Sequence, residues 1–149
     1  MIPGGFGPRR DEPLPEGSLE GDTPLTETLV GLITDTHDNQ PLVGRAVDLF
    51  NERGVGLVLH GGDYIAPFNA RPLKGLRAPF VGVFGNNDGE RFGLRAAFLE
   101  IGPIQRAPHE VVHSGKKILM LHEPDALDAL AASGIYDVMS DAANAAVQG

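Results

Sequence analysis

The sequence contains no cysteine among its 149 residues, which excludes disulfide bonds, thiolate metal sites and cysteine nucleophiles. It has no tryptophan and only two tyrosines, so it offers little aromatic surface on which nucleobases could stack. No apolar run reaches the roughly 18 residues of a membrane-spanning helix. The N-terminus also lacks the basic and then apolar order of a secretory signal. We therefore expect a cytoplasmic protein with no membrane partner.

Positive charge is also scarce. Lysine and arginine number 12 against 20 aspartates and glutamates, which gives a formal net charge of −8. This is the wrong sign for a protein that binds nucleic acid through bulk charge, so we expect no such partner. Apolar residues make up 42% of the chain and charged residues 21%, values typical of an ordinary globular domain.

Residues 1–28 differ in composition from the rest of the chain. They are rich in glycine, proline and acidic residues and show no hydrophobic period. Such a composition cannot bury a core, so it predicts a disordered, solvated tail. The predicted folded domain covers residues 29–149.

From Leu29 onward, short apolar runs alternate with amphipathic segments, a pattern that predicts an α/β fold. The predicted strands cover residues 29–33, 55–59, 80–84 and 118–121, with a hairpin turn at 114–115. The predicted helices cover 41–53, 91–100 and 125–132, and the prolines in 66–77 indicate a loop with a short helix. In the second helix, the predicted stripe that faces the core runs from Phe92 through Arg95 and Ala96 to Leu99.

Every one of these four strands is followed by side chains that can bind a metal. They are Asp35 and His37 after the first, Asp63 after the second, Asn86 and Asp88 after the third, and His122 after the fourth. Ligands of open α/β sheets bind outside the carboxyl ends of the strands, so we expect these groups to form one cluster. Carboxylate, amide and imidazole donors suit Mn, Fe, Ni or Zn, and their number predicts two divalent ions.

The blocks Asp35-x-His37, Gly62-Asp63, Gly85-Asn86-x-Asp88 and His122 resemble, in order and approximate spacing, the motifs of calcineurin-like metallophosphoesterases. The resemblance covers about residues 29–140 and is greatest to the small YfcE-type phosphodiesterases of bacteria and archaea. It implies an α/β/β/α sandwich that holds two divalent metal ions, Mn foremost. It also implies hydrolysis of a small phosphodiester by metal-activated water without a covalent intermediate.

The same resemblance assigns roles to single residues. Asp35 and His37 would bind the first ion, Asp63 would bridge both ions, and Asn86 and His122 would bind the second. The candidate catalytic residues are Asn86 and Asp88. Asp88 matches a position near the leaving group, where it would orient the substrate or assist proton transfer.

One block of the family pattern is missing. The family continues with Gly-His-x-His, which gives one histidine to each metal, whereas residues 140–149 contain no histidine. We therefore expect a C-terminally shortened sandwich in which Asp141 or Asn144 could supply an oxygen ligand. Three explanations stay open, namely a degenerate or truncated paralogue, an altered reading frame or engineered chain, and a site completed by substitutes.

The missing block also leaves an alternative to the enzyme. A catalytically impaired member of the same fold would act as a binding or scaffold module. A doubly wound nucleotide-binding domain is a weaker hypothesis, because no Gly-x-Gly-x-x-Gly or Walker loop follows the first strand. An unpaired sheet edge would also permit a homo-oligomer.

The remaining histidines and a small basic cluster have no motif around them. We expect His60 to pack beside the site, and His109 and His113 to be structural or on the surface. Arg71, Lys74 and Arg77 are expected on a solvated face.

Overall fold

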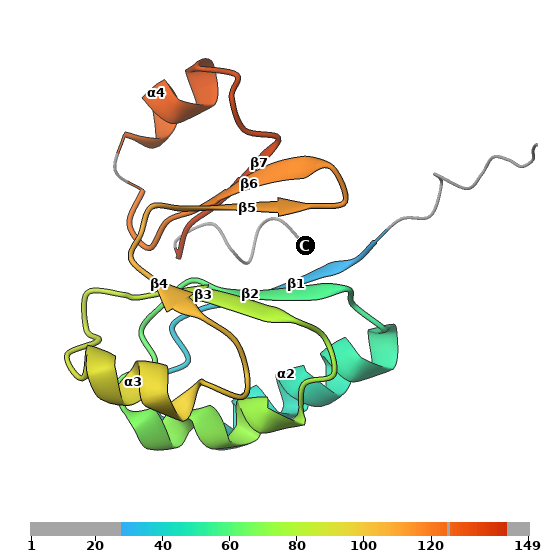
Figure 1. Ribbon diagram of the computed structural model, residues 1–149, viewed down its shortest axis with the longest axis vertical. Helices are drawn as coiled ribbons and strands as arrows, with labels where there is room; N and C mark the ends of the chain where they lie inside the picture. Colours follow the sequence, from blue (N-terminus) through green and yellow to red (C-terminus); the bar gives the residue numbers. More distant parts are fainter. Residues whose placement is uncertain (1–27, 125, 143–149) are drawn as a thin grey trace, which may run out of the picture.

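The computed structural model describes residues 28–124 and 126–142, which form two β-sheets packed face to face with helices on their outer sides (Figure 1). The first sheet is parallel, with the order β1-β2-β3-β4: β1 (Val30–Ile33), β2 (Leu57–His60), β3 (Phe80–Val83) and β4 (Ile104–Gln105). The second sheet pairs β5 (His109–His113) antiparallel with β6 (Lys116–Met120), and β6 parallel with β7 (Val138–Ser140). The predicted α/β class is confirmed.

Two α-helices and a 3₁₀ helix cover the outer face of the first sheet, and a short helix lies beyond the second sheet (Figure 1). The covering elements are α2 (Gln40–Arg53), η3 (Pro67–Gly75) and α3 (Arg91–Ala97), and the short helix is α4 (Leu127–Ala132). No helix in the described ranges is both long and apolar enough to cross a membrane. Of the predicted tail, residues 1–27 lie outside the described part of the chain.

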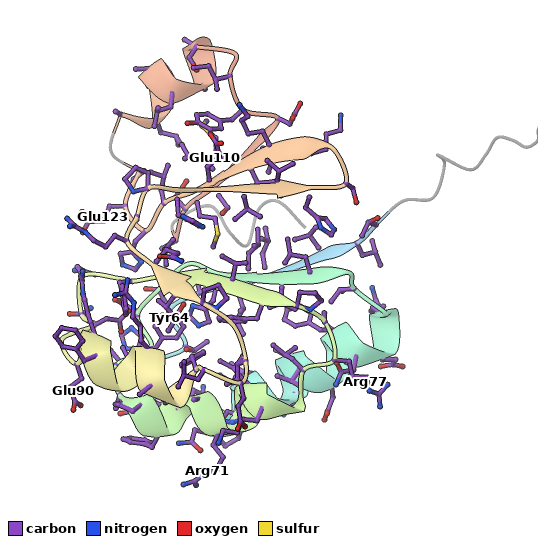
Figure 2. The ribbon with its side chains drawn as sticks, viewed as in Figure 1. Tyr64, Arg71, Arg77, Glu90, Glu110 and Glu123 are labelled. Carbon is purple, nitrogen blue, oxygen red and sulfur yellow. The ribbon has the colours of Figure 1, made fainter. Side chains whose placement is uncertain are left out.

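The core consists of two apolar layers, one on each face of the first sheet. Between this sheet and its helices lie Val43 and Val47 of α2 together with Tyr64, Phe80 and Phe98. Figure 2 shows Tyr64 in this layer, below the sheet. The second layer fills the space between the two sheets and contains Leu57, Leu59, Val83, Ile118 and Met120. Because both faces of β2 and β3 are covered, these strands appear in the sequence as continuous apolar runs.

Helix α2 begins and ends where its sequence predicts. The Asn39 side chain accepts a hydrogen bond from the Leu42 N–H at 3.3 Å, which caps the first turn. Gly54 ends the helix in the left-handed conformation, with φ of 64°.

The buried residues in and beside helix α3 differ from the predicted stripe. Phe92 and Leu99 are 90% and 82% exposed, whereas Leu94 and Phe98 are buried. Both pairs fit helical spacing, and the packing against η3 and β3 selects the second pair. The segment that contains Pro72 also differs, because it forms one continuous 3₁₀ helix of nine residues.

The fourth predicted strand corresponds to β6, which belongs to the second sheet. The predicted site residues therefore follow strands of two sheets, three strands in the first and one in the second. Strand β3 pairs with β2 on one side and with β4 on the other. Strand β4 has two residues, which are too few to show a period in the sequence. The candidate site consequently lies where the ends of two sheets meet.

Candidate metal centre

The loops that follow β1 and β2 are joined through their backbones. The Gly61 N–H donates to the Ile33 carbonyl at 2.9 Å, and the Asp35 N–H donates to the Gly62 carbonyl at 2.9 Å. The His37 N–H donates to the Asp63 carbonyl at 3.1 Å. These bonds fix the Asp35-x-His37 segment against the loop that carries Asp63.

Three of the predicted ligands adopt the left-handed backbone conformation. The φ angles are 51° at Asp35, 46° at His37 and 65° at Asp63. Ile65 follows at 75°, although a β-branched side chain strongly disfavours this region. Backbone strain of this kind persists only where surrounding contacts impose it, and it concentrates at functional sites.

Asp63 is the centre of the cluster. Its side chain is buried, with Oδ2 at 3.5 Å from His37 Nε2 and Oδ1 at 3.6 Å from His122 Nε2. The Asn87 backbone N–H donates to Oδ1 at 3.0 Å, and the Asn87 side-chain amide donates to Oδ2 at 2.9 Å. Burial raises the pKa of Asp63, but the Asn87 hydrogen bonds and the nearby His122 and His37 lower it, and the net pKa lies below 3.8. Asp63 is therefore a carboxylate at neutral pH.

His122 reaches the cluster from the second sheet, two residues beyond the end of β6. Its Nδ1 lies 2.7 Å from the Gly61 carbonyl oxygen, which can only accept, so Nδ1 carries the proton. In the neutral ring the lone pair is then on Nε2, which lies 2.9 Å from Asn86 Oδ1. Asp35, Asp63 and His122 each place a potential ligand atom within 4.8 Å of the others. The structure thus brings all five predicted metal residues into one cluster.

Asp88 lies beside this cluster and is only 3% exposed. Its Oδ1 accepts the N–H groups of Tyr64 and Ile65 at 2.7 and 2.8 Å. Its Oδ2 accepts those of Asp63 and Gly85 at 2.8 and 2.7 Å. Four backbone donors occupy the carboxylate, so its observed role is to hold together the loops after β2 and β3. The predicted role of Asp88 in substrate orientation or proton transfer stays a prediction.

His60 packs beside the site, as predicted. It is fully buried and stacks on Tyr64, with ring centroids 4.1 Å apart. Nδ1 accepts the Gly62 N–H at 3.0 Å, so Nε2 carries the proton and donates to Thr36 Oγ1 at 3.1 Å. Burial is the main cause that lowers the pKa of His60 to about 3, with His122 adding to the decrease and Asp63 opposing it.

Glycine is required at two positions where the loops touch. A Cβ on Gly62 would lie 2.6 Å from the Gly85 nitrogen, and φ at Gly62 is 110°. A Cβ on Gly85 would collide with the Asp63 carboxylate. Without a side chain, Gly62 and Gly85 permit close approach of one loop to the other.

The C-terminal candidates are only partly described. The strand pairing of β6 with β7 continues past Ser140, because the Leu121 N–H donates to the Ser140 carbonyl and the Ala142 N–H to the His122 carbonyl. Asp141 is buried and lies on this extension, beside the His122 segment. Asn144 lies outside the described residues.

Sequence reasoning missed three contributors to the site. Asn87 holds the Asp63 carboxylate, and Thr36 anchors His60. Arg106 lines a pocket that also contains Asn86 and His122. The position of Asn87 between two candidate residues was the one available signal. Arg71 and Arg77 point away from both sheets, at the outer edge of the helical layer (Figure 2).

Comparison with known proteins identifies the family. The model of the calcineurin-like phosphoesterase superfamily domain matches residues 29–149. The chain is 29% identical over 121 residues to the phosphodiesterase MJ0936 of Methanocaldococcus jannaschii, a match that covers 74% of this chain and 69% of that protein. The solved structure of an archaeal phosphodiesterase matches with a TM-score of 0.69 and 31% identity, over 74% of this chain and 69% of its own. The YfcE phosphoesterase of E. coli shares the fold, with a TM-score of 0.51 and 18% identity over 63% of this chain and 57% of its own. This chain therefore belongs to the calcineurin-like phosphoesterase superfamily.

Proposed function

We propose that this chain is a cytoplasmic, metal-dependent phosphodiesterase that hydrolyses small phosphodiesters with two divalent metal ions, Mn foremost. The observation that carries the proposal is the environment of Asp63, whose two carboxylate oxygens each face a different histidine, His37 and His122. A carboxylate between two imidazoles is the arrangement that a bridging ligand between two ions requires. Membership of a family whose characterised relatives are named phosphodiesterases supports the reaction class.

The donor atoms around His122 fit a metal ion. Its Nε2 lone pair and Asn86 Oδ1 are both acceptors when the ring is neutral, yet they lie 2.9 Å apart. Two ligand atoms on one ion with bonds of ~2.1 Å are separated by about 3 Å, so a cation between them would satisfy both. The Nδ1–H bond to Gly61 supplies the outer contact that commonly orients a ligating histidine.

The five proposed metal ligands divide into two sets that share Asp63. Asp35 and His37 would hold one ion, and Asn86 and His122 the other. Bound ions of this kind lower the pKa of water and stabilise charge on the phosphoryl oxygens. The chain itself holds the ligands in place. Asn87 orients the Asp63 carboxylate, and Thr34 Oγ1 donates to Asp35 Oδ2 at 2.6 Å. Mn, Fe, Ni and Zn all suit this mixture of carboxylate, amide and imidazole.

A non-catalytic binding or scaffold module is the second candidate, and the ligand count favours it. Residues 140–149 contain none of the histidines that the family's Gly-His-x-His block supplies. Fewer ligands lower the affinity for metal, since even loss of an outer contact costs ~10–100-fold. The two candidates therefore differ in metal stoichiometry and in turnover.

The test is hydrolysis of bis-p-nitrophenyl phosphate by the full chain with added Mn²⁺, together with a count of bound metal. We expect turnover with about two ions per chain, and loss of ~100-fold or more in Asp63→Asn, because the amide keeps the shape but removes the bridging charge. Asp48→Asn, on the exposed face of α2, serves as the matched control and keeps the wild-type rate. Equal rates in wild type and Asp63→Asn, with less than one ion per chain, would overturn the enzyme and favour the binding module.

A further inference from the structure

A pocket of about 510 Å³ opens beside the candidate metal centre, between the two sheets' ends and α4. Asn86 and His122, two of the proposed ligands, form part of its wall. A substrate whose phosphorus lies at the metal centre would therefore extend an ester arm into this pocket. The chemistry of the remaining wall indicates what that arm contains.

Two arginines line the pocket, and they differ in how they are held. The Arg91 Nε donates to the Asp88 carbonyl at 3.1 Å and its terminal nitrogen to the Gly85 carbonyl at 3.4 Å. The guanidinium also lies over the Phe84 ring, 4.8 Å from the centroid. Arg91 is thus part of the wall, fixed by carbonyls and an aromatic face.

Arg106 has no such partners. Within residues 28–124 and 126–142 its guanidinium has no hydrogen bond, and no carboxylate lies within salt-bridge distance. Glu123 also lines this pocket, and it forms no ion pair with Arg106. Arginine presents a planar fork of donors that matches a phosphate or carboxylate. Arg106 is exposed and has no carboxylate partner among the described residues, so its guanidinium is available to an anionic ligand in this pocket beside the proposed metal centre.

Part of the remaining wall is apolar. Phe84, Pro108, Leu121 and Leu130 supply side chains with no polar group, while Glu123 adds a carboxylate. A pocket that combines apolar walls with a few placed polar groups is typical of small-molecule sites. This wall fits an organic arm that carries its charge at one point.

We infer that this pocket binds one ester arm of the phosphodiester and that Arg106 binds a second phosphate group carried by that arm. The inference rests on the proposed function, and it narrows the substrate class to phosphodiesters with a further phosphate on one arm. Arg106 is thereby a specificity-determining residue that acts on the choice of substrate.

The test compares two chromogenic substrates that differ by one phosphate. They are thymidine 5′-(p-nitrophenyl phosphate) and the same compound with an additional 3′-phosphate. In wild type with Mn²⁺ we expect kcat/KM to be about tenfold higher for the second compound, the gain that one charge-assisted contact provides. In Arg106→Gln we expect the two kcat/KM values to become equal. Arg106→Lys retains part of the preference, because it keeps the charge without the fork.

The matched control is Arg71→Gln, which removes the same charge from an exposed position on η3. It keeps the full preference if the effect is local. A wild type that hydrolyses both compounds equally well, or an Arg71→Gln variant that loses the preference as Arg106→Gln does, would overturn the inference and leave the phosphodiesterase intact.

A binding measurement separates this inference from the proposed function. Calorimetric titration of the full chain without added metal compares thymidine 3′,5′-bisphosphate with thymidine 5′-monophosphate. We expect tighter binding of the bisphosphate by wild type and loss of that difference in Arg106→Gln, even if no substrate is hydrolysed. Equal affinities for the two nucleotides in wild type would refute the second phosphate subsite.

Discussion

The four hydrogen bonds to Asp88 make its replacement by asparagine a sharp test of the site. Each carboxylate oxygen accepts two backbone N–H groups at 2.7–2.8 Å, from Tyr64 and Ile65 on one oxygen and from Asp63 and Gly85 on the other. Asparagine offers one accepting oxygen and one donating NH₂. In either orientation of the amide, its NH₂ group faces two backbone N–H donors and cannot accept a hydrogen bond from either of them.

The expected cost follows from this count. A hydrogen bond to a charged group contributes roughly 1.5–3 kcal/mol, so the loss of two lowers the free energy of unfolding by about 3–6 kcal/mol. That is a large share of the ~5–15 kcal/mol that stabilises an ordinary domain. We therefore expect Asp88→Asn to unfold at a much lower urea concentration than wild type.

The assay is urea unfolding followed by circular dichroism at neutral pH, with a chelator present so that bound metal adds nothing to stability. Asp48→Asn, an exposed carboxylate on α2, is the control and stays within ~0.5 kcal/mol of wild type. An Asp88→Asn variant that retains wild-type stability and loses only kcat would refute the positioning role. It would instead support the proton-transfer role that the family resemblance implies.

Two further predictions concern the layer beneath the site. The buried Tyr64 hydroxyl has no partner among the described residues, so we expect Tyr64→Phe to leave the melting temperature unchanged or raise it, and a clear decrease would contradict this. Gly82→Ala, whose Cβ would collide with that hydroxyl, should cost ~1–3 kcal/mol alone and less when combined with Tyr64→Phe. The second prediction uses the pKa of His60, which is about 3 in the folded chain against 6.5 in the unfolded chain. The unfolded chain binds the extra proton between these values, so stability falls as pH decreases below 6.5, by at most ~1.4 kcal/mol per unit from this group. Urea unfolding at pH 7.5 and 5.0 should show a loss of about 2 kcal/mol more in wild type than in His60→Asn, and equal losses would refute a neutral buried histidine.

The strands and the order of the site residues were predictable because their signals are local. Apolar runs buried on both faces mark β2 and β3, and turn residues with glycine mark the loops that follow them. Asp35 and Asp63 follow apolar runs within three residues, so their proximity follows from the rule that ligands bind at the carboxyl ends of strands of one sheet. His122 also follows an apolar run, but it reaches the cluster from the second sheet.

Features that depend on packing between distant segments were not predictable. The short β4 and the separate second sheet change which strands are neighbours, and no period in the sequence records this. In α3, Leu94 and Phe98 compete with Phe92 and Leu99 as the buried pair, and only contact with the sheet decides between them. The four backbone hydrogen bonds to Asp88 could not be predicted either, because their donors belong to residues as many as 25 positions away in the sequence.

The same backbone contacts explain how strained ligand loops keep their shape. Left-handed φ values at Asp35, His37 and Asp63 cost on the order of 1 kcal/mol each, the low end for aspartate and histidine, so about 3 kcal/mol together. The four bonds to Asp88, each worth roughly 1.5–3 kcal/mol, hold the loop that contains Asp63. The Asp35 and His37 N–H groups donate to carbonyls of that loop, which holds the first loop against it. The loops therefore hold their geometry by contacts within the chain, with no contribution required from a metal ion. An ion that enters such a site loses little binding free energy to loop ordering, and this offsets part of the affinity that a smaller set of histidines removes.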